Sequence, residues 1–320
     1  MKDKLFCTHY KIGYKNVFYI NYIKKIRLDL FLKKKFLKYS RSFLKTFILN
    51  DKVFINGIIC NKPSKKINFS IITFIDFFKK KDFFIPENIP LKFVYEDDNI
   101  AVVDKDKGII MHPGNGNYSG TILNSILYHI KESKNIPRAG IVHRLDKNTT
   151  GLFVFAKDLV TYYKLIKLIK FKRVIREYEA IVVGKIFSNG KISIPIKRHK
   201  KIRTKMSVDM LGKPSITHYK VIRRFSDCTH VRIRLETGRT HQIRVHFLYI
   251  KHPIIGDKTY FIKKNIHFLN KNKLNYIRKF PRQALHAVML KFKHPIKNNI
   301  IRCFSNLPKD IKKLMNFLKK

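Results

Sequence analysis

The sequence contains no tryptophan and only four cysteines among its 320 residues. The cysteines are far apart and form no CxxC pair: Cys7, Cys60, Cys228 and Cys303. Structural zinc and iron–sulfur sites usually take closely spaced cysteine pairs, so neither kind of site is expected. The scarcity of cysteine therefore indicates free thiols in a reducing compartment.

Acidic residues are also few. The chain has 21 Asp and Glu residues against 69 Lys and Arg residues, which gives a formal charge of +48. So basic a chain is expected to bind a polyanion, and nucleic acid fits that description best. Residues 1–85 carry 20 basic and 5 acidic side chains, a net of +15, and the other 235 residues carry +33. Because the charge is spread along the whole chain, it does not locate a binding face.

Long apolar runs are absent as well. The longest stretch without Lys, Arg, Asp or Glu, residues 108–130, contains a proline and four glycines, so it does not predict a membrane-spanning helix. The N-terminus has no clean apolar segment followed by a small-residue cleavage site. A cytoplasmic protein is expected, and a monomer, since no heptad repeat indicates a coiled coil.

The first 85 residues predict a small basic module. Apolar residues at helical spacing predict a helix over 27–37, and Ser40 is a candidate N-cap for a second helix. Further on, Asn56-Gly57 lies between two short apolar runs and is typical of a tight hairpin turn. Arg41 and Lys45 lie four residues apart on the polar face of the second helix. They either contact nucleic acid or, about as often for such residues, only face solvent.

A lysine-rich and proline-containing segment at 79–90 is typical of a linker. It predicts an N-terminal domain over 1–85, a linker to about residue 90, and a second domain over 91–320. The expected elements of the second domain are strands at 91–95, 100–104, 139–143, 152–156, 178–183, 217–222, 229–235 and 285–292, and helices at 121–131 and 158–170, the latter with Asp158 as N-cap. Strands outnumber helices at irregular spacing, so we expect an α+β fold with a largely antiparallel sheet.

Several familiar site patterns fail on spacing. The glycines at 114–120 include a third glycine that comes one residue too late for a dinucleotide-binding loop. Gly212-Lys213 lacks the earlier glycine of a phosphate-binding loop, and no serine lies in a Gly-x-Ser-x-Gly elbow. His241 and His246 are five residues apart, whereas a helical metal pair needs four. The sequence therefore predicts neither a metal nor a cofactor.

The segment 140–151 (GIVHRLDKNTTG) presents one carboxylate, Asp146, after an apolar run and before a turn. This pattern predicts a single acid at the end of a buried strand. Such an aspartate either does chemistry, or it caps the turn or pairs with a surface lysine. Position alone favours the second interpretation.

Two other segments favour a chemical role for Asp146. Residues 236–246 follow an alternating strand and place a turn and then Arg239 and Arg244, and such a turn can bring a guanidinium to a carboxylate from another strand. A nearby arginine keeps a carboxylate ionised at pH 7. Tyr178 begins a predicted strand. Its ring either packs in the core or stacks on a base, which is worth about 1–3 kcal/mol.

The stretch His143-Arg144-Leu145-Asp146, followed by Thr-Thr-Gly, resembles the signature of the synthases that convert uridine to pseudouridine in large-subunit ribosomal RNA. Residues 27–66 resemble the αL RNA-binding module, of the type found in ribosomal protein S-four, that is often fused to them. Further matching blocks follow in the same order at 94–97, 112–114, 137–140, 212–214, 237–246 and 282–287. The resemblance runs from about residue 20 to about residue 315.

The resemblance implies a catalytic domain of the pseudouridine synthase type, with a largely antiparallel mixed sheet, behind an αL domain. It implies an isomerase, an intramolecular transferase that detaches uracil, turns it over and rejoins it through carbon without a cofactor. Asp146 is then the catalytic acid, which attacks the sugar or the base or removes a sugar proton. By the same resemblance Arg239 pairs with Asp146, Arg244 is the alternative for that pairing, and Tyr178 stacks on the uracil.

The resemblance also implies the RNA contacts. Arg144 fills the space that the flipped uridine leaves, and His143, Arg244, Arg41 and Lys45 contact the RNA. The expected partner is large-subunit (23S) ribosomal RNA or its precursors, at specific loop uridines, with no membrane involved. Two alternatives remain open: the same chemistry on another ribosomal or transfer RNA site, and a non-catalytic RNA-binding factor for ribosome assembly.

Overall fold

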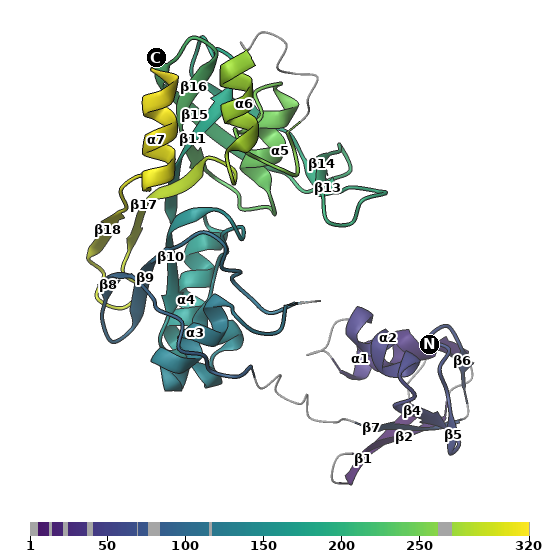
Figure 1. Ribbon diagram of the computed structural model, residues 1–320. Coiled ribbons are helices and arrows are strands. Elements are labelled where there is room, and N and C mark those ends of the chain that lie inside the picture. The colour runs from purple at the N-terminus through teal and green to yellow at the C-terminus, as the bar shows by residue number, and fades with distance from the viewer. Residues whose placement is uncertain are drawn as a thin grey trace. The chain divides into compact units, whose positions relative to one another are not determined.

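The computed structural model describes residues 6–12, 15–21, 25–36, 41–68, 70–75, 84–114, 117–261 and 271–319. The chain divides into two compact units, Met1–Phe83 and Phe84–Lys320 (Figure 1). Each unit has buried apolar clusters of its own. Among the described helices, none is long and apolar enough to cross a membrane.

In the described part of the first unit, a five-stranded antiparallel sheet packs with two helices. Its sheet strands are hydrogen-bonded in the order β1-β2-β7-β4-β5, with β1 at Phe6–Ile12, β2 at Lys15–Asn21, β4 at Val53–Ile55, β5 at Ile58–Ile59 and β7 at Ser70–Ile75. Two short strands, β3 (Ile26–Arg27) and β6 (Lys66–Ile67), pair with each other. The helices are α1 (Leu28–Lys35) and α2 (Arg41–Leu49), and both contribute buried apolar side chains to one cluster with the sheet.

The local predictions for this unit are confirmed where the structure describes them. The helix expected over 27–37 is α1, and the expected hairpin is β4–β5. Asn56 has a φ of 52° and Gly57 a φ of 82°, which is the left-handed pair that a type I′ turn requires. The second helix forms as α2, while its candidate N-cap Ser40 lies outside the described residues.

The second unit is built on a nine-stranded sheet. The strands follow the order β12-β15-β16-β11-β17-β10-β9-β8, and β18 also pairs with β17. Their bounds are β8 Phe93–Glu96, β9 Ile100–Lys105, β10 Thr150–Ala156, β11 Ile175–Val183, β12 Gly190–Ser193, β15 Ile216–Arg224, β16 Cys228–Leu235, β17 Leu285–Lys293 and β18 Ile300–Phe304. Every pairing in this sheet is antiparallel except β10 with β17.

Within the described residues, a two-stranded ribbon, five α-helices and two short 3-10 helices complete this unit. The ribbon strands and α-helices are β13 (Ile196–Arg198), β14 (Met206–Val208), α3 (Ile122–His129), α4 (Leu159–Lys170), α5 (Gln242–Tyr249), α6 (Lys271–Lys279) and α7 (Lys309–Leu318). Asp158 caps α4 as predicted, since its carboxylate accepts a hydrogen bond from the Thr161 N–H at 2.8 Å. The expected α+β class with a largely antiparallel sheet is confirmed.

Apolar side chains cover both faces of the middle of the sheet. In β10, Phe153 and Phe155 pack into one cluster with residues of α3, α5 and α7, whereas Leu152 and Val154 pack into another with residues of α4. The sequence of a strand that is buried on both faces is a continuous apolar run, without alternation of apolar and polar residues. This double coverage explains why β10 has no polar face in the sequence.

One expectation for this unit is wrong, and one helix was not expected. The strand predicted over 139–143 is instead a short 3-10 turn (Pro137–Gly140), followed by a single bridge from Ile141 to Phe155. Arg138 and Ala139 both have positive φ, a conformation that no strand can hold. The turn expected after the alternating strand forms over residues 236–241, but the residues from Gln242 onward form helix α5, which the sequence did not predict. The first six residues of α5 are all buried, so the sequence has no alternation of apolar and polar faces that would indicate a helix.

Gly151 lies in β10 beside β17, and its backbone has a φ of +107°. A Cβ at this position would lie 2.3 Å from the Ala287 carbonyl oxygen. We therefore expect Gly151→Ala to lower the free energy of unfolding by about 3 kcal/mol or more, as measured by urea denaturation. The control is Gly108→Ala, where φ is +87° but nothing lies within 4 Å, and the expected loss is only about 1–2 kcal/mol. Equal losses for the two variants would contradict the packing argument.

Candidate active site

Asp146 lies in an irregular segment that leads into β10, and not at the end of a strand as the sequence predicted. The Thr149 N–H donates to the Asp146 carbonyl oxygen at 3.0 Å and closes a turn between them. The Asp146 side chain is 17% exposed. The acid is thus sheltered on most sides and open on one.

Buried side chains from two other segments hold the turn after Asp146 through its main-chain oxygens. Lys105 of β9 donates from Nζ to the Lys147 carbonyl at 3.0 Å. Arg282 donates from Nη1 to the Asn148 carbonyl, also at 3.0 Å. Burial lowers the pKa of Lys105 to about 7. These contacts fix the backbone that carries the acid.

Arg244, on α5, joins Asp146 to a second and deeper carboxylate. Its Nη1 donates to Asp146 Oδ2 at 2.9 Å, while Nε and Nη2 donate to the two oxygens of Asp257 at 2.6 and 2.8 Å. Asp257 is 1% exposed, and its Oδ1 also accepts the backbone N–H groups of Thr259 and Tyr260. Burial alone would lower the pKa of Arg244, but its contacts with Asp257 and Asp146 raise it above the usual value. The guanidinium is therefore charged and fixed in direction.

The pairing predicted between Arg239 and Asp146 is wrong, and Arg244, the alternative, makes it. Arg239 lies exposed in the turn before α5, where its Nε donates to the Pro214 carbonyl at 3.3 Å. Its N–H is held by Gln242 Oε1 at 3.0 Å. Because the helix begins at Gln242, it is the inward-facing Arg244 that reaches the acid, and the sequence did not predict this helix.

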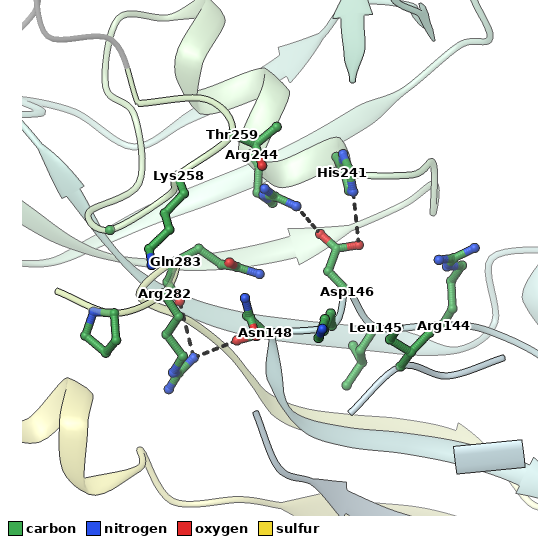
Figure 2. A pocket seen from close by; sticks show the side chains of 14 residues that line it. Arg144, Leu145, Asp146, Asn148, His241, Arg244, Lys258, Thr259, Arg282 and Gln283 are labelled. Carbon is green, nitrogen blue, oxygen red and sulfur yellow. Dashed lines mark hydrogen bonds and ion pairs between the residues drawn. The ribbon is translucent and has the colours of Figure 1, made fainter. Parts of the chain in front are cut away.

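His241 flanks the other oxygen of the acid, so that Asp146 lies between Arg244 and His241 (Figure 2). The His241 Nε2 is 3.9 Å from Asp146 Oδ1, and its Nδ1 is 2.8 Å from the Tyr260 hydroxyl oxygen. The Tyr260 ring also lies against Arg244, whose guanidinium carbon is 4.9 Å from the ring centroid. Burial lowers the pKa of His241, so the imidazole is neutral at pH 7.

These side chains surround a cavity of about 300 Å³. Its lining consists of Ile110, Arg144, Leu145, Asp146, Lys147, Asn148, His241, Arg244, Gly256, Lys258, Thr259, Pro281, Arg282 and Gln283. Asp146 is the only carboxylate in that lining, among five lysines and arginines. Such a cavity suits an anionic ligand of nucleotide size. Across the described residues, no group of His, Cys, Asp and Glu is arranged to hold a metal ion.

The two residues before Leu145 differ in what they can contact. Arg144 is exposed and lines the cavity, where a ligand can reach it. His143 turns into the protein, because its Nε2 accepts the Val154 N–H of β10 at 3.1 Å. Burial lowers the pKa of His143 to about 3. Its ring thus anchors the segment to the sheet through Nε2, and because the side chain is only partly buried, the RNA contact of His143 stays a prediction.

Tyr178 is buried in the core of the second unit and does not line the cavity. It is 5% exposed, and in β11 it shares a face with Arg176 and Ala180. Burial raises its pKa, and the charge of Asp146 adds to that shift, so the phenol lies within the field of the acid. The stacking of Tyr178 on a base stays a prediction that requires the ring to be uncovered.

In the first unit, Arg41 and Lys45 surround a buried acid, Asp29. Arg41 donates from Nε and Nη2 to Asp29 Oδ2 at 3.0 and 2.8 Å, and Lys45 Nζ lies 4.0 Å away. Burial would raise the pKa of Asp29, but its hydrogen bonds with Arg27 and Arg41 lower it. The side chains of Arg41 and Lys45 are 45% and 44% exposed, so both also face solvent. Their contact with RNA stays a prediction.

The roles of His241, Asp257, Tyr260 and Arg282 in this site were not predicted from the sequence. His241 and Arg282 lie in matching blocks of the resemblance, and His241 was otherwise weighed only as a metal ligand. Asp257 and Tyr260 lie in irregular structure after Gly256, where no periodicity indicates burial. The one available signal was that an isolated aspartate in a very basic chain needs an arginine partner if it is buried.

Comparisons with known proteins find relatives of both parts of the chain. A family model described as RNA pseudouridylate synthase matches residues 99–249, and a model of the S4 domain matches residues 26–70. A protein of Buchnera aphidicola subsp. Acyrthosiphon pisum, named ribosomal large subunit pseudouridine synthase D, is 53% identical over 90% of this chain and 93% of its own length. The protein of that name from Pasteurella multocida is 45% identical over 92% and 91%. The solved structure of human RNA pseudouridylate synthase domain containing 4 shares the fold, with a TM-score of 0.57 and 24% identity over 71% of this chain and 93% of that one.

The different environments of the two arginines lead to a test by unfolding. Arg244→Met leaves the Asp257 carboxylate buried without its cation, so we expect a loss of about 3–5 kcal/mol in the free energy of unfolding. Arg239→Met makes the same change at an exposed position, and the expected loss is under about 1 kcal/mol. A larger loss at Arg239 than at Arg244 in urea denaturation would contradict the assignment.

Proposed function

The chain belongs to the RNA pseudouridylate synthase family, and from this we propose that it isomerises uridine to pseudouridine in large-subunit ribosomal RNA. The observation that carries the proposal is a lone carboxylate, Asp146, fixed by Arg244 in a basic cavity. The substrate is taken from the relatives, whose name specifies the large ribosomal subunit. Enzymes that modify this RNA in bacteria work in the cytoplasm, so the chain is proposed to act there.

The reaction fits a site with one acid. Pseudouridine formation breaks the bond from the ribose to N1 of uracil, turns the base over, and forms a bond from the same ribose carbon to C5. The proton lost from C5 is balanced by the proton gained at N1, and no electrons are transferred to another molecule. Hydrolysis of a glycosidic bond, by contrast, usually takes two carboxylates, one of which activates water.

The structure offers no second acid for hydrolysis within the cavity lining. Asp257 is the nearest candidate, but both of its oxygens bind Arg244, and it is 1% exposed. Asp146 keeps one oxygen, Oδ1, that accepts no hydrogen bond from the described residues. We assign to Oδ1 the chemical step, which is attack on the sugar, attack on the base, or removal of a sugar proton.

A uridine must leave its helix or loop before a carboxylate can reach the glycosidic bond, at a cost of a few kcal/mol. Arg144, exposed at the cavity, is proposed to fill the space that the base leaves. The exposed lysines of the cavity, Lys147 and Lys258, would attract the phosphates on either side of the flipped nucleotide.

The S4-type module is proposed to supply affinity and site choice. Arg41 and Lys45 present half-exposed charges that Asp29 holds in place, as phosphate contacts require. The proposed domains are residues 1–85 for this module, with a linker to about residue 90, and residues 91–320 for the catalytic domain. RNA binding would then be strongly salt-dependent.

The assignment of Asp146 is tested by Asp146→Asn, which keeps the shape of the side chain and removes its charge. We expect turnover to fall by more than about 1,000-fold, while the dissociation constant for RNA changes by less than about threefold. Release of tritium from RNA labelled at uridine C5 measures the reaction. The control is Asp98→Asn, which removes a charge from an exposed position. Near-normal turnover by Asp146→Asn would refute the catalytic role.

The substrate is tested by mapping pseudouridines in RNA that has been incubated with the purified protein. Unmodified large-subunit ribosomal RNA, small-subunit ribosomal RNA and transfer RNA are compared. We expect conversion at specific loop uridines of the large-subunit RNA, because bases in loops are the least costly to flip. Conversion confined to transfer RNA or small-subunit RNA would overturn the substrate assignment, and no conversion with intact RNA binding would favour the assembly-factor alternative.

A further inference from the structure

His241 is held in an unusual backbone conformation at the edge of the cavity. Its φ of 56° and ψ of 21° lie in the left-handed region, which few residues other than glycine adopt. It is the N-cap residue of α5, yet its side chain makes no capping hydrogen bond. The imidazole is instead directed at Oδ1 of Asp146, while Arg244 reaches the other oxygen, Oδ2 (Figure 2). Backbone strain of this kind persists where surrounding contacts hold it, often at functional sites.

Tyr260 determines which nitrogen of His241 carries the proton. The hydroxyl oxygen of Tyr260 accepts the Met206 N–H at 2.8 Å and lies 2.8 Å from His241 Nδ1. Tyr260 is 4% exposed, and burial raises its pKa, so the phenol keeps its proton. A buried hydroxyl needs an acceptor for that proton, and among the described residues Nδ1 of His241 is the one within reach. The neutral imidazole therefore carries its own proton on Nε2, the nitrogen that faces Asp146.

The gap between His241 and Asp146 has the size and chemistry of a binding site for one atom. The donor Nε2 and the acceptor Oδ1 are 3.9 Å apart, too far for a hydrogen bond between them. An oxygen atom placed about 2.8 Å from Nε2 and from Oδ1 would form a hydrogen bond with each of them. That oxygen has to accept from Nε2 and donate to Oδ1, which a hydroxyl does and a carbonyl oxygen does not.

We propose that His241 and Asp146 together bind the ribose 2′-hydroxyl of the target uridine, with His241 donating to it and Asp146 accepting from it. This inference rests on the proposed function, because it takes the ligand to be a nucleotide within an RNA chain. In such a nucleotide the 3′ and 5′ oxygens are tied up in phosphodiesters, so the 2′-hydroxyl is the only hydroxyl. The contact would place Oδ1 beside the sugar carbon that exchanges its bond, and it would distinguish RNA from DNA.

The ribose fits this position better than the base does. The edge of uracil also carries a donor next to an acceptor, but the base turns over during the reaction while the ribose stays. A fixed pair of groups beside Asp146 can hold the sugar from the beginning to the end of the reaction. Tyr260 is then a positioning residue, which acts on the substrate only through the tautomer of His241.

The test compares two RNAs that do not react, since all binding constants are then measurable. One is the product RNA with pseudouridine at the target site, and the other is the same RNA with 2′-deoxypseudouridine there. We expect His241→Phe to weaken binding of the first about 10-fold and to leave binding of the second unchanged. His129→Phe, the same change on an exposed histidine of α3, is expected to affect neither RNA.

Two further variants test the same contact if the phenylalanine variant folds poorly. His241→Gln retains an N–H near the position of Nε2 and is expected to restore most of the preference for the ribose hydroxyl. His241→Asn, whose amide is too short to reach that position, is not. Equal weakening of both RNAs by His241→Phe, or no weakening of either, would overturn the proposal. Absence of turnover by the wild-type enzyme would instead count against the proposed function.

Tyr260→Phe separates the positioning role from simple packing. Without the phenol proton, Nδ1 of His241 loses its donor, and the proton divides between the two nitrogens. We expect the ¹⁵N shifts of the His241 ring to move away from a pure Nε2–H form, and the preference for the ribose hydroxyl to fall severalfold. Unchanged ¹⁵N shifts would overturn the role given to Tyr260.

Discussion

One guanidinium shared by two carboxylates is the interaction on which the site depends. Arg244 gives two of its N–H groups to Asp257, which is itself held by backbone amides, and this leaves Nη1 directed at Asp146. Because the arginine cannot turn, the acid has one preferred orientation, with Oδ2 bound and Oδ1 open. Asp146 and Arg244 are 98 residues apart in the sequence, so a single side chain joins an early loop to a late helix. A buried arginine shared in this way fixes the orientation of its partner carboxylates more than it adds to the stability of the fold.

The one parallel pairing of the large sheet brings the supports of this acid together. Since β10 and β17 run in the same direction, their first residues lie side by side, with Thr150 opposite His286 and a 2.8 Å contact between Thr150 Oγ1 and His286 Nδ1. The segments that enter the two strands therefore meet, and Arg282 reaches the turn after Asp146. An antiparallel partner would have brought the far end of its strand to this place.

The sequence predicted the elements whose signals are local and missed those that depend on distant contacts. The Asn56-Gly57 hairpin and the Asp158 cap follow from the conformational needs of two or three neighbouring residues, and both form as expected. The start of α5 was missed because its first six residues are all buried. Arg239, which the resemblance pairs with Asp146, lies in the exposed turn before this helix, and Arg244 within the helix makes the contact. Asp146 was identified from its neighbours, but the tertiary contacts that explain its orientation leave no periodic trace in the sequence.

The turn that follows Asp146 is held almost entirely through its backbone. The Lys147 carbonyl accepts hydrogen bonds from Lys105 Nζ and the Gly108 N–H, and the Asn148 carbonyl accepts one from Arg282. Every residue type offers a carbonyl, so the identities of residues 147 and 148 are free to drift without moving the acid. The side chains at these two positions can therefore change, and with them the contacts to a ligand, while Oδ1 of Asp146 stays in place. Selectivity can thus evolve separately from catalysis.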